Sequence, residues 1–173
     1  MSENSSQFAF VVMGVSGCGK STVGQLLAEQ LGVEFIEGDQ YHSIDNVQKM
    51  ASGNPLNDSD RMQWLAILAE KLAQAKASQS SLVMSCSALK KSYRDILRSG
   101  NPNVCFVYLQ GTFDVLNQRV STRSHQYMPA SLLTSQLATL EPPQQSENAL
   151  TFDVSLTAKE IANNVVAYLQ KPI

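Results

Sequence analysis

The stretch GVSGCGKS, which runs from Gly14 to Ser21, decides the fold of this chain. It has the pattern of a glycine, any four residues, and then glycine, lysine and serine, which is typical of a phosphate-binding loop. The glycines let the backbone turn its N–H groups toward phosphate oxygens. Lys20 can reach the β and γ phosphates, and the Ser21 hydroxyl can bind Mg²⁺. The stretch therefore predicts a site for a nucleoside triphosphate.

The segments on either side of this loop support the prediction. Residues 8–13 (FAFVVM) are continuously apolar, as in a strand buried inside a parallel sheet, and residues 21–31 repeat apolar side chains at helical spacing. The positive end of that helix would add to the field at the phosphates. The predicted nucleotide contacts are the whole loop and the next residue: Gly14, Val15, Ser16, Gly17, Cys18, Gly19, Lys20, Ser21 and Thr22.

Length and composition favour one domain, residues 1–173. A chain of 173 residues with 43% hydrophobic residues can bury a substantial core. A formal net charge of −2 leaves no basic stripe, which disfavours binding to nucleic acid. No apolar run approaches the roughly 20 residues that cross a bilayer, and the first residues, MSENSSQ, lack the features of a signal peptide. We therefore expect a cytoplasmic protein without membrane contact.

The three cysteines, Cys18, Cys86 and Cys105, are an odd number and lack the spacing of metal ligands. This usage indicates reduced thiols in a cytosolic protein rather than a disulfide framework.

Strand and helix patterns alternate along the rest of the chain, which predicts an α/β fold with a parallel sheet covered on both faces. Residues 38–76 are too long for a plain connection and predict a helical insertion. A helix after 157 begins with a capping box formed by Thr157 and Glu160. We expect further strands at 33–37, 82–86, 104–109 and 151–155, and further helices at 45–51, from a cap at Asp58 through Leu72, and at 88–98, 112–123, 129–140 and 157–170.

Other polar patterns narrow the class of nucleotide-binding protein. The chain contains neither the Asn/Thr-Lys-x-Asp string nor the Asp-x-x-Gly switch of a GTPase. A motor or transporter ATPase would normally be longer. The small size and the predicted insertion after the second strand therefore favour a kinase for a small molecule or a nucleoside monophosphate.

Asp39 follows the second predicted strand, at the edge of the sheet where ligands gather in open α/β folds. Its carboxylate could orient or take the proton of an acceptor hydroxyl, or hold Mg²⁺ together with Ser21. A plain structural alternative is a helix cap for the segment that follows.

Three further groups of residues carry a resemblance to a known family. They are GDQYH at 38–42, with Asn46, KMASG at 49–53 and PLNDSDR at 55–61 before Trp64; CSALK at 86–90 with YRD at 93–95; and SQ at 135–136 with TLEP at 139–142. Together with the phosphate loop, they resemble the gluconate kinase family over nearly the whole chain. The sequence departs from the family pattern at Ser43, at Gln63 and at residues 125–127 (HQY), where the family often has Gly-His-Phe.

The resemblance implies ATP-dependent phosphorylation of D-gluconate at its terminal hydroxyl, which gives 6-phospho-D-gluconate. It also implies a three-layer P-loop kinase fold with five parallel strands in the order 2-3-1-4-5, a lid at 119–130 and a homodimer. ATP and Mg²⁺ are the implied cofactors. Lys20, Asp39, Arg119 and Arg123 are the predicted catalytic residues.

The chemistry of gluconate, an open-chain polyol with one carboxylate, fits the cationic residues of these motifs. Arg61 and Arg94 could each offer a planar fork to the carboxylate, and Lys90 a point charge. His42 could bond to hydroxyl groups, whereas Trp64 falls on an apolar helix face and favours the core. We expect Asp39, His42, Arg61, Lys90 and Arg94 at the substrate, although each cation could also be a solvated surface group.

Arg119 and Arg123 lie four residues apart and so share one face of a predicted helix. We expect both to bind ATP phosphates when the lid closes, with the adenine near Arg119 and the loop after Ser155. Two alternatives stay open. One is a kinase for another sugar acid, shikimate or a nucleoside monophosphate; the other is a non-catalytic nucleotide-binding module.

Overall fold

The computed structural model describes residues 6–122 and 131–171. Its centre is a sheet in the order β2-β3-β1-β4-β5, in which every neighbouring pair is parallel. The predicted α/β class and strand order are therefore confirmed. β1 lies in the middle, where Val11 pairs with Met84 on one side and Phe106 on the other. The strands are β1 (Ala9–Met13), β2 (Glu34–Glu37), β3 (Leu82–Ser85), β4 (Cys105–Gln110) and β5 (Ala149–Asp153).

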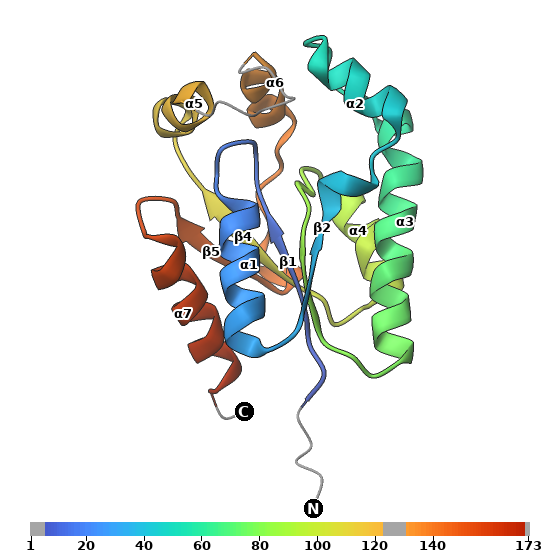
Figure 1. Ribbon diagram of the computed structural model, residues 1–173, viewed down its shortest axis with the longest axis vertical. Coiled ribbons are helices and arrows are strands. Elements are labelled where there is room, and N and C mark those ends of the chain that lie inside the picture. Colours follow the sequence, from blue (N-terminus) through green and yellow to red (C-terminus); the bar gives the residue numbers. More distant parts are fainter. Residues whose placement is uncertain (1–5, 123–130, 172–173) are drawn as a thin grey trace, which may run out of the picture.

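Helices cover both faces of this sheet (Figure 1). α1 and α7 pack together on one face, and α3 and α4 pack together on the other. The helices are α1 (Lys20–Leu31), α2 (Ile44–Ala51), α3 (Asp58–Ala77), α4 (Lys91–Gly100), α5 (Phe113–Thr122), α6 (Leu132–Thr139) and α7 (Ala158–Leu169), with short 3₁₀ turns η1 (Gly38–Tyr41) and η2 (Gln145–Glu147).

The long stretch between β2 and β3 has two different parts. α3 buries Trp64, Leu65, Leu68 and Leu72 in the main core, so it is the crossover helix that returns the chain to the sheet. η1 and α2 instead lie beyond the carboxyl ends of the strands, as do α5 and α6 (Figure 1). Because the loops at this edge converge, residues from distant parts of the chain meet there.

Three predicted element boundaries are corrected by the structure. α4 begins at Lys91 rather than 88, because Ala88 has a φ of +46° and Lys90 is extended, and neither conformation continues a helix. The cap of α3 is Asn57 rather than Asp58, because the Asn57 side chain accepts from the Asp60 N–H and the Asp60 carboxylate accepts from the Asn57 N–H. β5 begins at Ala149, ahead of the predicted 151.

Other local predictions agree with the structure or fall outside the described part of the chain. The capping box of Thr157 and Glu160 is confirmed, and Cys18, Cys86 and Cys105 are buried free thiols. The predicted start of a helix at Pro129 lies outside the described residues. Within residues 6–122 and 131–171, no helix is long and apolar enough to span a membrane.

Candidate active site

The phosphate loop needs its first two glycines for room as well as for backbone conformation. Gly14 has a φ of +145°, and a Cβ there would lie 2.7 Å from Cys18 Sγ and 2.9 Å from the carbonyl oxygen of Leu109. Gly17 has a φ of +83°, and its Cβ would lie 2.8 Å from the Val120 side chain. Any larger residue would therefore push the loop away from β4 and α5.

Lys20 opens α1 and folds back over the loop. Its Nζ donates to the carbonyl oxygen of Val15 at 3.2 Å and lies 4.0 Å from Cys18 Sγ. The backbone N–H of Ser16 donates to Oε1 of Gln136 at 2.8 Å, which brings α6 onto the loop. The loop is thus held by its own lysine and by a residue 120 positions further along the chain.

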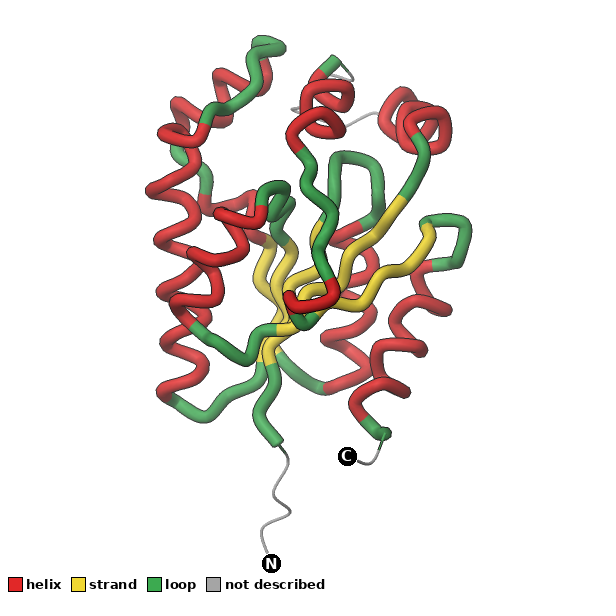
Figure 2. Tube along the Cα trace, turned by 180° about the vertical axis from the view of Figure 1, so that it is seen from behind, coloured by secondary structure: helices red, strands yellow, loops and turns green. Residues whose placement is uncertain are grey.

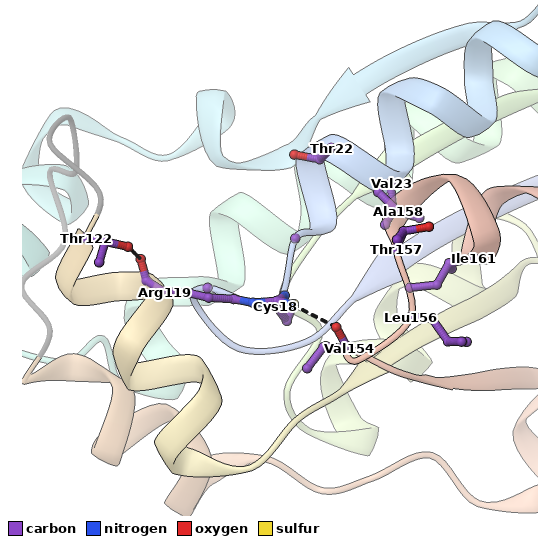
Figure 3. A pocket seen from close by; sticks show the side chains of 12 residues that line it. Cys18, Thr22, Val23, Arg119, Thr122, Val154, Leu156, Thr157, Ala158 and Ile161 are labelled. Carbon is purple, nitrogen blue, oxygen red and sulfur yellow. Dashed lines mark hydrogen bonds between the residues drawn. The ribbon is translucent and has the colours of Figure 1, made fainter.

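A cavity of about 370 Å³ opens beside the loop (Figure 3). Arg119 of α5 lies at one side and donates from Nη2 to the carbonyl oxygen of Val154 at 2.7 Å. The cavity is lined by Gly17, Cys18, Gly19, Thr22, Val23, Arg119, Thr122, Val154, Leu156, Thr157, Ala158 and Ile161. Arg119 and the residues after Ser155, where we expected the adenine, therefore share one cavity with the loop. Arg123, the other predicted lid arginine, lies outside the described residues.

A second cavity, of about 20 Å³, lies next to the loop at the carboxyl end of β2. It brings together Lys20, Asp39, His42 and Arg61, four of the predicted site residues. Its other lining residues are Ser16, Met50, Leu56, Trp64, Ser87 and Gln136. Since Ser16 and Lys20 belong to the phosphate loop, the loop lines both cavities.

His42 is held in the second cavity by Trp64. The two rings are stacked, with centroids 4.0 Å apart, and the indole N–H donates to the carbonyl oxygen of Gly38 at 2.8 Å. Burial, aided by the positive charge of Arg61, lowers the pKa of His42 to about 4. Nε2 of His42 lies 4.0 Å from Asp39 Oδ1. His42 is therefore neutral near pH 7 and can both donate and accept hydrogen bonds.

The sequence favoured the core over stacking on a substrate for Trp64, and the core position is confirmed. Trp64 is 2% exposed, packs in the main core and also lines the second cavity beside His42. An apolar helix face predicts burial and does not reveal which neighbour the indole touches.

Arg61 reaches the second cavity from the first turn of α3 and is fixed by Tyr93. Its Nη1 donates to the Tyr93 hydroxyl oxygen at 3.0 Å, and Tyr93 in turn donates to Asp58. Lys90 Nζ also donates to Asp58, at 2.9 Å. Among the described residues, Lys90, a predicted substrate residue, is not part of the lining of the second cavity. It is connected to Arg61 indirectly, by hydrogen bonds through Asp58 and Tyr93.

The expectation that Arg94 binds substrate is corrected by its position. Its side chain is fully buried and forms a bidentate pair with Glu147, at 2.8 and 3.2 Å. Nη1 donates to the carbonyl oxygens of Ala88 and Leu89. Arg94 therefore secures the loop after β3 from within the protein and has no open face for a ligand.

Glu147 is the residue that sequence reasoning could not pair with Arg94. The chain after α6 runs down over the face of the sheet seen in Figure 2 to η2. Glu147 of η2 accepts from Arg94 and Arg98 of α4. Burial alone would raise the pKa of Glu147, but hydrogen bonds from Arg94, the Gln144 N–H and Arg98 lower it to about 2. The pair is thus charged near pH 7.

No metal cluster is built from side chains in the described part of the chain: no group of three or more His, Cys, Asp or Glu residues could hold an ion there. The predicted magnesium residues, Ser21 and Asp39, come from the first turn of α1 and from η1.

Comparisons with known proteins agree with this architecture. A family model described as shikimate kinase matches residues 16–170. The thermoresistant gluconokinase of Escherichia coli K12 is 41% identical over 170 residues, covering 97% of each chain. A probable gluconokinase of Rattus norvegicus is 43% identical, covering 92% of this chain and 96% of its own.

Among solved structures, a gluconokinase from Sinorhizobium meliloti 1021 superposes with a TM-score of 0.84 at 47% identity, covering 94% of this chain and 91% of its own. One family assignment follows from the strand order, from the phosphate loop beside two cavities and from these similarities. The chain belongs to the gluconokinase family, on the shikimate-kinase-like branch of the P-loop kinases.

Proposed function

We propose that this enzyme transfers the γ-phosphoryl group of ATP to the terminal hydroxyl of D-gluconate, giving 6-phospho-D-gluconate and ADP. The proposal rests on one observation: the phosphate loop lines both cavities. Lys20 and Ser16 of the phosphate loop line the same cavity as Asp39, His42 and Arg61, while other residues of the loop line the 370 Å³ cavity. One loop can therefore serve a nucleotide in one cavity and an acceptor in the other.

The larger cavity suits the nucleotide. Its loop end offers backbone N–H groups to phosphates at the N-terminus of α1. Its far end is apolar at Leu156, Ala158 and Ile161, which suits the flat face of a base. Arg119 lies between the two ends and would turn from the carbonyl of Val154 toward the phosphates.

The side chains around the second cavity suit a carboxylated polyol, although this cavity of about 20 Å³ must widen to admit one. Arg61 is 8% exposed and lies at the cavity wall, where its guanidinium could pair with a carboxylate. Neutral His42 can donate to one hydroxyl group or accept from another. Asp39 is the carboxylate in this cavity that could orient or deprotonate the attacking hydroxyl.

Phosphoryl transfer needs mainly positioning and neutralisation of charge. In the proposed reaction Asp39 orients the acceptor oxygen, and Lys20 stabilises the negative charge that spreads over the transferring group. Ser21 and Asp39 supply the hard oxygen atoms that Mg²⁺ prefers and would hold it, with the phosphates completing its shell. Bound Mg²⁺ would neutralise phosphate charge. We further propose, on the family resemblance, a homodimer that works in the cytoplasm.

A substrate panel tests this proposal. The purified protein is given MgATP with gluconate, other sugar acids, shikimate or AMP, and ADP release is measured for each acceptor. We expect kcat/KM for gluconate to exceed that of every other acceptor by at least about 100-fold, a difference that a lost charged hydrogen bond can produce. Preference for shikimate or AMP would assign a different acceptor. Tight ATP binding without any transfer would support a nucleotide-binding module instead.

A further inference from the structure

α6 contacts both sides of the proposed transfer site, although no role has been given to it. It lies beyond the sheet between α5 and α2 (Figure 1). From its middle, Gln136 accepts the hydrogen bond of the Ser16 N–H at 2.8 Å, and Gln136 also lines the second cavity. The phosphate loop and the acceptor cavity therefore share this side chain.

The first residue of α6 contacts the acceptor side. Leu132 is 3% exposed and forms a small apolar cluster with Met50 of α2 and with Leu56, which precedes α3. Met50 and Leu56 line the second cavity. This cluster is separate from the main core, which buries the next residue of α6, Leu133. α6 therefore contacts the acceptor wall through Leu132 and the main core through Leu133.

The far end of α6 is anchored to the body of the protein. Just past the helix, the Glu141 N–H donates to the carbonyl oxygen of Leu89 at 2.7 Å, and the Glu141 carboxylate accepts from the Lys91 N–H at 2.9 Å. These bonds tie the end of α6 to the start of α4. The helix therefore has a fixed base, an apolar contact with the acceptor wall and a polar contact with the phosphate loop.

We propose that α6 couples the two substrate sites, with Leu132 at the acceptor end and Gln136 as the positioning residue at the donor end. A ligand that holds Met50 and Leu56 in place also holds Leu132, and through the helix it keeps Gln136 on the Ser16 N–H. Gluconate then raises the affinity of the loop for ATP, and by linkage ATP raises the affinity for gluconate by the same factor. The proposal rests on gluconate being the acceptor.

The experiment measures the dissociation constant of a non-hydrolysable ATP analogue with and without saturating gluconate. In the wild type, gluconate should tighten binding by about 5-fold or more, the lower range of measured couplings between sites. Gln136→Met and Leu132→Ala should each reduce the factor to below about 2-fold. The double variant should lose no more than either single variant, because both changes interrupt the same link.

Two matched controls make the same chemical changes elsewhere. Gln74→Met changes an exposed glutamine on α3 whose amide donates to Glu70 at 3.4 Å, and Leu169→Ala trims a partly buried leucine of α7. Both should keep the wild-type coupling. Gln136→Glu keeps an acceptor oxygen for the Ser16 N–H but adds negative charge near the phosphates, so it should weaken analogue binding while keeping the coupling factor.

The outcomes separate this proposal from the proposed function. If Gln136→Met turns over gluconate normally and keeps the wild-type coupling factor, the role of α6 is wrong but the proposed function stands. The same conclusion follows if the wild type binds both ligands without coupling. Absence of gluconate turnover in the wild type would instead reject the proposed function. If Leu132→Ala does not fold, the coupling factor of Gln136→Met alone tests the role of α6.

Discussion

Arg61 and Tyr93 are joined by a 3.0 Å hydrogen bond from the guanidinium to the phenolic oxygen, and the guanidinium carbon lies 5.3 Å from the centre of the same ring. Tyr93 donates onward to Asp58, which Lys90 also contacts. The guanidinium that we propose for the substrate carboxylate is thus held in place by contacts within the protein. Fixing it reduces the side-chain entropy that binding would otherwise lose.

Tyr93→Phe removes this hydrogen bond and keeps the ring. We expect KM for gluconate to rise about 10- to 150-fold, the range that corresponds to losing a hydrogen bond to a charged group. KM for ATP should stay within about 2-fold, because Tyr93 is absent from the nucleotide cavity. Tyr168→Phe, an exposed tyrosine of α7, is the control. Steady-state kinetics would reject the role of Tyr93 if both KM values changed equally.

Arg94→Met should destabilise the protein strongly. The variant breaks the buried ion pair of Arg94 and Glu147 and leaves Arg98 as the remaining cation beside the Glu147 carboxylate. Breaking a buried ion pair costs about 3–5 kcal/mol of the free energy of unfolding. Lys91→Met, which breaks the exposed pair with Asp95, should cost less than about 1 kcal/mol. Urea denaturation followed by circular dichroism measures both. A loss for Arg94→Met as small as that for Lys91→Met would show that the buried pair contributes little.

The stability of the folded protein should fall as the pH is lowered from about 7 to 5. The folded state holds the pKa of His42 at about 4, below its ordinary 6.5, so in this window the unfolded chain binds a proton that the folded protein does not. The free energy of unfolding then decreases by at most about 1.4 kcal/mol per pH unit. Glu147, with a pKa of about 2, contributes the same sign only at lower pH.

His42→Gln tests the source of that pH dependence. The variant lacks the titrating group and should show a smaller loss of stability than the wild type between pH 7 and 5, measured by urea denaturation at both values. Identical pH dependence in the two proteins would mean that His42 is not the group responsible.

Lys20→Met and Asp39→Asn should each lower kcat by at least about 100-fold while the protein stays folded. In the proposed reaction Lys20 stabilises the negative charge of the transferring group, and Asp39 orients or deprotonates the acceptor hydroxyl. Asp39→Asn should keep its affinity for ATP, measured without Mg²⁺, within a few-fold, since the amide has nearly the same shape. Either variant with near-normal kcat would remove that residue from the proposed mechanism. Lys71→Met, on α3 beside the Tyr41 ring, is the control for the loss of a lysine.

The sequence predicted the features that depend on neighbours in the chain. The phosphate loop, the alternation of strands and helices and the capping box at Thr157 each follow from residues a few positions apart, and the structure agrees with them. The family resemblance supplied the strand order, which periodicity alone does not give. Local errors arose where two residues compete for one role, as Asn57 and Asp58 do at the start of α3.

Contacts between distant residues were harder to predict. Arg94 lies four positions from the motif residue Lys90, but its partner Glu147 is 53 positions away and reaches it only after the chain crosses the sheet. An arginine that binds a carboxylate inside the protein and one that binds a substrate look the same in sequence. The contact of Gln136 with Ser16 was likewise hidden, although the Ser-Gln motif was visible.

The most direct test of the central claim is to identify the product. ³¹P NMR follows a reaction of the purified protein with MgATP and gluconate labelled with ¹³C at its terminal carbon. We predict one phosphomonoester signal that grows in step with ADP and couples to the labelled carbon, and no such signal with Lys20→Met. ADP formation accompanied only by inorganic phosphate, or a phosphoester without coupling to that carbon, would contradict phosphorylation of gluconate at its terminal hydroxyl.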